Sequence, residues 1–208
     1  MTASLKHYIE NHILPRYAAF DAAHQRDHAD MVIRESIALA RYYDVNEDMV
    51  YTIAAYHDTG LAVDRKTHHL ESGRIIRADG RLREWFTPEQ IEIMAEAVED
   101  HRASSDHEPR SIYGKIVAEA DRLIDTDTIL RRTVQYGFAH YPEMAREEHI
   151  TRAIEHLHEK YAEGGYLKLW IPESPNAARL QSLWALIRQE DELRQRVEKM
   201  YEEELVER

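Results

Sequence analysis

The chain has 208 residues and a formal net charge of −12, with 13 histidines and no cysteine. Its 7 glycines and 6 prolines are about half the usual share of these residues, which argues against sandwiches, propellers and many-stranded barrels. The 43% of hydrophobic residues can supply a buried core. An acidic chain without Lys/Arg-rich runs is a poor nucleic-acid binder. The lack of cysteine excludes disulfides, thiolate metal sites and a cysteine nucleophile.

The sequence contains no apolar run near the ~20 residues that a membrane-spanning helix needs. Its first residues, MTASLKHYIENHIL, also lack the apolar segment of a signal peptide. We therefore expect a cytoplasmic protein that has neither a membrane nor a nucleic acid as partner. The high histidine count suggests metal or acid–base chemistry, because imidazole titrates near neutral pH and is the commonest metal ligand.

Apolar periodicity and capping residues predict helices along the whole chain. A first helix over residues 3–23 should be split at Pro15, and Asp27 should cap a second helix that runs to Tyr43. Asn46 is a cap for the third helix, and Thr87-Pro88-Glu89-Gln90 is a strong helix start. The other expected helices cover residues 47–61, 68–79, 88–102, 111–131, 141–164 and 176–204. We expect a compact all-α bundle over residues 1–140, with residues 141–208 as a C-terminal helical extension packed on it.

Polar side chains continue the apolar stripes of four predicted helices. Residues 3, 4, 7 or 11 positions apart share a helix face, so each polar residue can be tested against its apolar neighbours. His28 aligns with Val32 and Leu39, and His57 aligns with Val50 and Ile53. The other inward-facing polar residues are Asp58, beside His57 on the same turn, His101, after Ile91, Met94 and Val98, and Asp121, aligned with Val117 and Ile124.

Two carboxylates and three imidazoles that all face inward need a shared partner, because burying an unpaired carboxylate is costly. A divalent cation satisfies both types of ligand. Taken singly, each histidine could be a hydrogen-bonded core residue. Other metal templates fit less well: H-E-x-x-H is absent, and only one Glu-x-x-His pair occurs, Glu155 with His158. His24 and His28, four residues apart, are a second-ranked chelating pair.

Three short segments resemble the HD superfamily of metal-dependent phosphohydrolases. They are QRDHADMV with His28, AAYHDTG with His57 and Asp58, and AEADRL with Asp121, in the order in which that superfamily carries its ligands. The resemblance covers about residues 20–130 and implies an all-helical fold in which these four residues bind a catalytic metal. One departure is Glu119, where the family segment often begins with Asp. The G-Y-P sequence of the cyclic-di-nucleotide branch is absent.

The resemblance also implies accessory groups around the metal. KTHHLESG and VEDHRASS resemble the segments in which many members add histidines for a second ion or for the substrate phosphate. These are His68, His69 and His101. Lys66, Arg102 and Arg122 adjoin ligand positions and could neutralise phosphate charge.

The expected activity is hydrolysis of a phosphate ester or anhydride in a small phosphorylated metabolite, with nucleotides as the first substrate class. The metal would lower the pKa of a bound water and polarise a phosphoryl oxygen, and Asp58 would also orient the water. Nitrogen and oxygen ligands suit Mn, Co, Fe, Ni or Mg as well as Zn, as one ion or two.

The alternatives are an HD-type di-iron oxygenase and a non-catalytic metal- or nucleotide-binding helical module. The protein could be a monomer or a homodimer. Six further histidines are expected to be solvated: His7, His12, His140, His149, His156 and His158.

Overall fold

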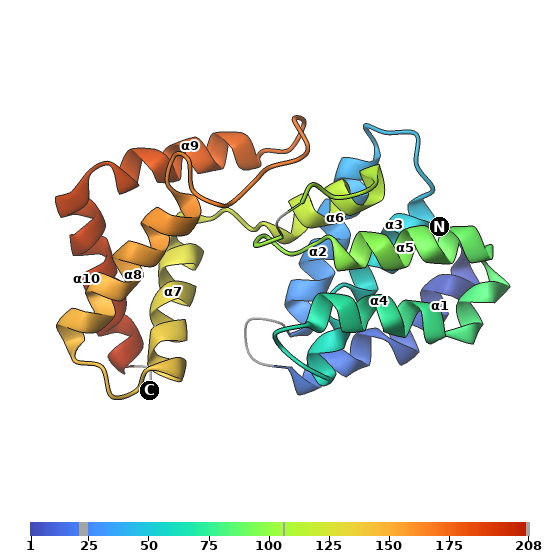
Figure 1. The fold of residues 1–208 in the computed structure, drawn as a ribbon, viewed down its shortest axis with the longest axis horizontal. Coiled ribbons are helices and arrows are strands. Elements are labelled where there is room, and N and C mark those ends of the chain that lie inside the picture. The colour runs from blue at the N-terminus through green and yellow to red at the C-terminus, as the bar shows by residue number, and fades with distance from the viewer. Residues whose placement is uncertain (21–24, 106, 207–208) are drawn as a thin grey trace. The chain divides into compact units, whose positions relative to one another are not determined.

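The structure is a computed structural model of the chain, and it describes residues 1–20, 25–105 and 107–206. These residues form ten α-helices, joined in part by short 3-10 helices, and contain no strand, which confirms the expected all-α class (Figure 1). None of the described helices is long and apolar enough to cross a lipid bilayer. The described residues divide into two compact units: unit 1 (1–122 with 170–174) and unit 2 (123–169 with 175–206).

Unit 1 is built around α3, of which eight consecutive residues from Met49 to Tyr56 are buried. The elements of unit 1 are α1 (Ala3–His12), η1 (Leu14–Ala19), α2 (Arg26–Ala40), α3 (Glu47–Tyr56), η3 (Thr59–Ala62), α4 (His68–Ala78), η4 (Gly80–Glu84), α5 (Pro88–Glu99) and α6 (Ile112–Asp121). Helices α2, α5 and α6 pack against α3, and α4 packs against α5. The site described below lies where these helices meet.

The segment 170–174 belongs to unit 1 because its side chains and backbone pack there. Ile171 is buried in the same core as α3. The backbone N–H of Trp170 donates to the buried carboxylate of Glu119 at 2.7 Å. Glu119, the departure from the family pattern, therefore anchors this segment through its side chain.

Unit 2 contains α7 (Thr126–His140), α8 (Arg146–Tyr161), α9 (Asn176–Ile187) and α10 (Glu190–Val206). Helices α7, α8 and α10 pack on one another, and α9 contacts α8 and α10 (Figure 1). His149 on α8 is buried, with its ring 5.1 Å from that of Phe138. The expectation that His149 is solvated was therefore wrong, because it faces the seam between α7 and α8.

Several helix boundaries differ from the expected ones. Residues 111–131 form two helices, because α6 ends at Asp121 and Asp125 starts α7 by accepting the backbone N–H of Thr128. Residues 176–204 are likewise divided, into α9 and α10. Helix α2 begins at Arg26, so Asp27 lies in its first turn and does not cap it. Because α7 packs with α8 and α10, the units divide after residue 122, whereas the sequence placed the boundary at residue 140.

The helix starts that depend on local capping chemistry were predicted correctly. The Asn46 side chain accepts backbone N–H groups of Asp48 and Met49. Thr87 and Gln90 form a capping box at the start of α5. The first helical stretch is split as expected, with α1 ending at His12 and Pro15 lying in η1.

Candidate metal centre

His57 and Asp58 lie directly after the end of the buried helix α3. The chain leaves the α-helix here and turns into η3, which sets the two side chains at the edge of the core. Tyr17 on η1 holds this turn: its hydroxyl donates to the Ala55 carbonyl at 3.0 Å and accepts the Asp58 backbone N–H at 3.3 Å. His57 and Asp58 are therefore positioned by the buried backbone around them as well as by packing.

Gly60 lets the start of α4 approach this turn. A Cβ on Gly60 would lie 2.0 Å from the carbonyl oxygen of His68 and 2.6 Å from the backbone nitrogen of Ser72. The Gly60 N–H donates to the Ser72 hydroxyl at 2.8 Å. Only a residue without a side chain fits here, and the close approach carries His68 to Asp58.

The first ligand group consists of His28 of α2 with His57 and Asp58 at the end of α3, and we include Asp121 at the end of α6 because it contacts both imidazoles. The Nε2 atoms of His28 and His57 lie 3.3 Å apart. His28 Nε2 lies 3.2 Å from Asp121 Oδ1, and His57 Nε2 lies 3.1 Å from Asp58 Oδ2. The four residues that the sequence analysis chose as metal ligands thus converge. Three of them are buried, and the side chain of Asp121 is 24% exposed at the edge of the group.

The second ligand group consists of Asp58, His68 and His101. His68 is the first residue of α4, and His101 follows the end of α5. Their Nε2 atoms lie 3.3 Å apart, and each lies 3.5 Å from Asp58 Oδ1. Asp58 therefore serves both groups, with Oδ2 turned toward the first and Oδ1 toward the second.

Backbone carbonyls orient three of the four imidazoles. His57 Nδ1 donates to Ala54, His68 Nδ1 to Arg65, and His101 Nδ1 to Val98, at distances of 2.8, 2.8 and 2.6 Å. A carbonyl can only accept, so the neutral rings carry their proton on Nδ1 and present the Nε2 lone pair. Metal-binding histidines are commonly oriented in this way.

The spacing of these atoms fits metal ligation. Ligand atoms about 2.1 Å from one ion lie roughly 3.0–3.4 Å apart at octahedral to tetrahedral angles. The ligand atoms of the second group lie 3.3–3.5 Å apart, and in the first group the imidazole nitrogens lie 3.1–3.8 Å from the carboxylate oxygens and 3.3 Å from each other. Nitrogen and oxygen donors without sulfur suit Mn, Co, Fe, Ni, Mg or Zn. The residues present therefore fit a divalent ion in each group.

The carboxylates of the first ligand group stabilise positively charged neighbours. Burial disfavours the charged form of His28, but hydrogen bonds and charge from Asp121 and Asp58 outweigh it and raise its pKa to about 9. Burial opposes the charge on Asp58, yet His57 and the other neighbouring imidazoles hold the pKa of this carboxyl well below its usual range. The pKa of Asp121 is also lowered, by His28 above all, against the effect of burial. Without a metal, protonation of His28 would offset part of the charge of the two carboxylates.

The second group behaves differently. Burial, reinforced by the charge of His101, lowers the pKa of His68 to about 4. Burial also opposes the charge on His101, but its hydrogen bond and charge interaction with Asp58 raise its pKa. One carboxylate facing two imidazoles favours the charged form of only one of them.

His101 is more deeply placed than expected. The position of His101 at the end of its apolar stripe suggested that it faces the mouth of the site, but it is only 2% exposed. Its ring packs edge-on against both His57 and His68, with centroids 5.3 and 5.2 Å away. That prediction was wrong because the ring packs between His57 and His68 with its Nε2 turned toward Asp58.

The other predicted residues lie around the two groups. His69 lies outside both, with its ring 5.7 Å from that of His68. Lys66 is exposed, and its carbonyl accepts a hydrogen bond from Arg102 Nη1 at 2.9 Å. Arg122 is buried beside Asp121 and donates to the Ala118 carbonyl. His24, of the second-ranked pair with His28, lies outside the described residues.

The sequence analysis missed the groups that brace the site. Asp100, next to His101, is buried and accepts both the backbone N–H and the guanidinium of Arg110, at 2.7 and 2.9 Å. This fixes the loop between α5 and α6. Tyr17 was also missed. No sequence pattern could have identified the Asp100–Arg110 pair or Tyr17, because these residues act through contacts between distant or irregular segments.

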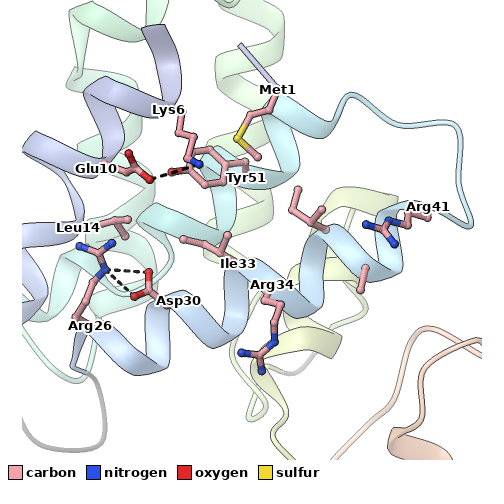
Figure 2. Close-up of a pocket in the computed structure, with 12 residues that line it drawn as sticks. Met1, Lys6, Glu10, Leu14, Arg26, Asp30, Ile33, Arg34, Arg41 and Tyr51 are labelled. Atoms are coloured by element: carbon pink, nitrogen blue, oxygen red, sulfur yellow. Dashed lines mark hydrogen bonds and ion pairs between the residues drawn. The ribbon is translucent and has the colours of Figure 1, made fainter. Parts of the chain in front are cut away.

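Two open pockets lie on unit 1. One is lined by residues of α1 and α2 and by Tyr51 of α3, with the ion pair Lys6–Glu10 within α1 and the ion pair Arg26–Asp30 within α2 (Figure 2). None of its lining residues belongs to either ligand group. The other pocket adjoins the second ligand group, since His69 and Arg102 line it. The functional site is therefore placed at the ligand groups, with this second pocket beside them.

Comparison with protein families agrees with this placement. Residues 26–125 match the HD domain family, a range that contains every member of both ligand groups. The match supports an HD-type domain that resembles those of metal-dependent phosphohydrolases. Neither the curated proteins nor the solved structures give a significant match to the chain.

Proposed function

We propose that this protein is a metal-dependent phosphohydrolase that cleaves a phosphate ester or anhydride of a small phosphorylated metabolite. The observation that carries the proposal is the pair of adjacent ligand groups that share Asp58. Nucleotides are the first substrate class to test. A bound divalent ion would supply a water of lowered pKa and would polarise a phosphoryl oxygen.

The protein's own residues would position the reactants. Asp58 is ionised at neutral pH and faces both groups, so it can accept a hydrogen bond from the attacking water and orient its oxygen toward phosphorus. Water adds to phosphorus as the bond to the leaving oxygen breaks, and the leaving oxygen takes up a proton. His57 and His101 present their Nε2 lone pairs toward the centre, because their Nδ1–H groups donate to backbone carbonyls.

Arg122 supports an anionic substrate. The residue is 6% exposed and follows Asp121 in the chain, and its guanidinium makes no carboxylate ion pair among the residues that the structure describes. A buried cation without a paired carboxylate is costly unless an anion approaches it. We assign Arg122 to the reacting phosphate, and Lys66, exposed on the loop before α4, to its outer edge.

The direct test is phosphate release from a set of phosphorylated metabolites, including nucleotides, with Mn, Co, Fe, Ni, Mg or Zn added to metal-depleted protein. Asp58→Asn is the matched control, since it keeps the shape of the side chain and removes its charge. The proposal requires turnover in the wild type that depends on added metal and is lost in Asp58→Asn. No phosphate release with any metal and substrate would contradict it.

A di-iron oxygenase is the second candidate, favoured specifically by the presence of two ligand groups with a shared carboxylate. Iron content combined with visible absorption in air tests it. Two irons per chain with an oxygen-dependent spectrum, and no phosphate release, would favour oxygenation.

A further inference from the structure

The pocket beside the second ligand group has a lining distinct from the ligand groups themselves. His69 and Leu70 of α4 form one wall, and Arg102, Ser104, Ser105 and His107 of the loop after α5 form another. We call this space the loop pocket. Its volume of about 490 Å³ is in the range of small-molecule sites. His69 directly follows the ligand His68, and Arg102 directly follows the ligand His101, so the pocket adjoins the centre.

The loop that forms the pocket is braced at several points. Arg110 closes it onto the buried Asp100 through backbone and guanidinium hydrogen bonds. Ser105 and His107 share a hydrogen bond of 2.6 Å between Oγ and Nδ1. Arg102 ties it to the loop before α4 by donating to the Lys66 carbonyl at 2.9 Å. These contacts hold the donors in place before a ligand arrives, which lowers the cost of binding.

The acidic residues that line the loop pocket are paired with other arginines, so Arg102 is available to bind an anion. Glu99 and Asp100 also line the pocket, but both pair with Arg110, and Glu99 pairs with Arg77 as well. Arg102 makes no ion pair with a carboxylate in the part of the chain that the structure describes. A guanidinium has five N–H donors, and the Lys66 carbonyl occupies the Nη1 side. Together with the Ser104 hydroxyl, Arg102 gives the lining donors and a positive charge.

We propose that the loop pocket binds a second anionic group of the substrate, a phosphate or a carboxylate, and that Arg102 is its main contact. The inference rests on the proposed function, because it places the reacting phosphate at the ligand groups. It assigns the substrate to metabolites with two separated anionic groups, such as bisphosphates or phosphorylated acids. Leu70 is the one apolar side chain among the lining residues, so the pocket does not suit a large apolar group.

Calorimetry with non-hydrolysable ligands tests this without turnover. Metal-loaded protein, freed of unbound metal, is titrated with propane-1,3-diphosphonate and with propylphosphonate, which lacks only the second anion. Ethane and butane homologues cover other spacings, and 4-phosphonobutyrate replaces the second phosphonate by a carboxylate. The variants are Arg102→Gln, Arg102→Lys and the control Arg83→Gln, an exposed arginine of η4 outside the pocket.

The wild type should bind at least one of the two-anion ligands about tenfold or more tightly than its one-anion counterpart, the scale of a charge-assisted hydrogen bond. Arg102→Gln should lose this difference while keeping metal content and propylphosphonate affinity. Arg102→Lys should keep part of the difference, and Arg83→Gln should keep all of it. The proposal is overturned if the wild type shows no preference, or if the preference survives in Arg102→Gln. If metal-loaded wild type binds no phosphonate at all, the proposed function itself fails.

Discussion

The two ligand groups share Asp58 but are built differently. The first has two carboxylates for two imidazoles and draws them from α2, the end of α3 and the end of α6. The second has one carboxylate for two imidazoles, at the start of α4 and just past the end of α5. The pKa values follow this difference, with His28 raised to about 9 and His68 lowered to about 4. The first group should therefore hold a cation more strongly than the second.

The largest effect is expected from Asp58→Ala, because this substitution removes the carboxylate that both groups use. Both metal ions should be lost, and turnover should fall by about 10³-fold or more, beyond the loss of a single electrostatic group. Elemental analysis and phosphate release on one preparation measure this. Retention of either ion at full occupancy would show that Asp58 does not bridge the groups.

His57→Ala should empty the first group. His57 is fully buried with its Nε2 among His28, Asp58 and Asp121, so its loss leaves a void lined by carboxylates. We expect loss of the tighter ion, loss of activity and a lower melting temperature in the metal-free protein. A variant that keeps two ions and wild-type turnover would remove His57 from the ligand set.

His101→Ala should empty only the second group. The first ion should stay, and turnover should fall by about 10²-fold, the scale of one catalytic group. His68→Ala should behave in the same way. His69→Ala is the matched control next to His68, and since His69 lies in neither group it should keep both ions. If His101→Ala and His68→Ala both keep full activity, the site works with one ion.

The pH dependence of the metal-free protein should separate the groups. His68 has a folded pKa of about 4 against about 6.5 unfolded, so the unfolded chain binds the extra proton and stability rises from pH 4 to 6.5. The pKa of His28 in the folded protein is about 9. Its contribution to the stability is therefore fully present below pH 6.5 and is lost as the pH rises to 9. Denaturation midpoints across this range should peak near pH 6.5. His28→Gln should flatten the alkaline limb, and an unchanged limb would contradict the assignment.

The smallest effect is expected from Tyr17→Phe. It removes the hydroxyl that contacts Asp58 N and the Ala55 carbonyl and leaves the ring in place. The loss should be about 1 kcal/mol of unfolding free energy, measured by denaturant titration, with both metals retained. A loss of metal in this variant would mean that the hydroxyl controls the position of Asp58.

The sequence predicted the first group more completely than the second. His28, His57, His101 and Asp121 each continue an apolar stripe and Asp58 adjoins His57, so helical periodicity could find them. His68, at the start of α4, was indicated only by the family resemblance, because loop paths decide what lies near a helix start. Periodicity could not show that His69 lies outside both groups, that Gly60 admits α4, or that Arg110 pairs with Asp100. The end of α6 at Asp121 was also missed, because periodicity does not show where one helix ends and the next begins.

The most direct test of the account is the number of tightly bound divalent ions per chain. The wild type, His57→Ala, His101→Ala and Asp58→Ala are compared after loading and removal of free metal. Two ligand groups joined by Asp58 predict two ions in the wild type, fewer in each histidine variant and none in Asp58→Ala. A wild type that binds one ion at most, with a content that His101→Ala does not change, would contradict the second group.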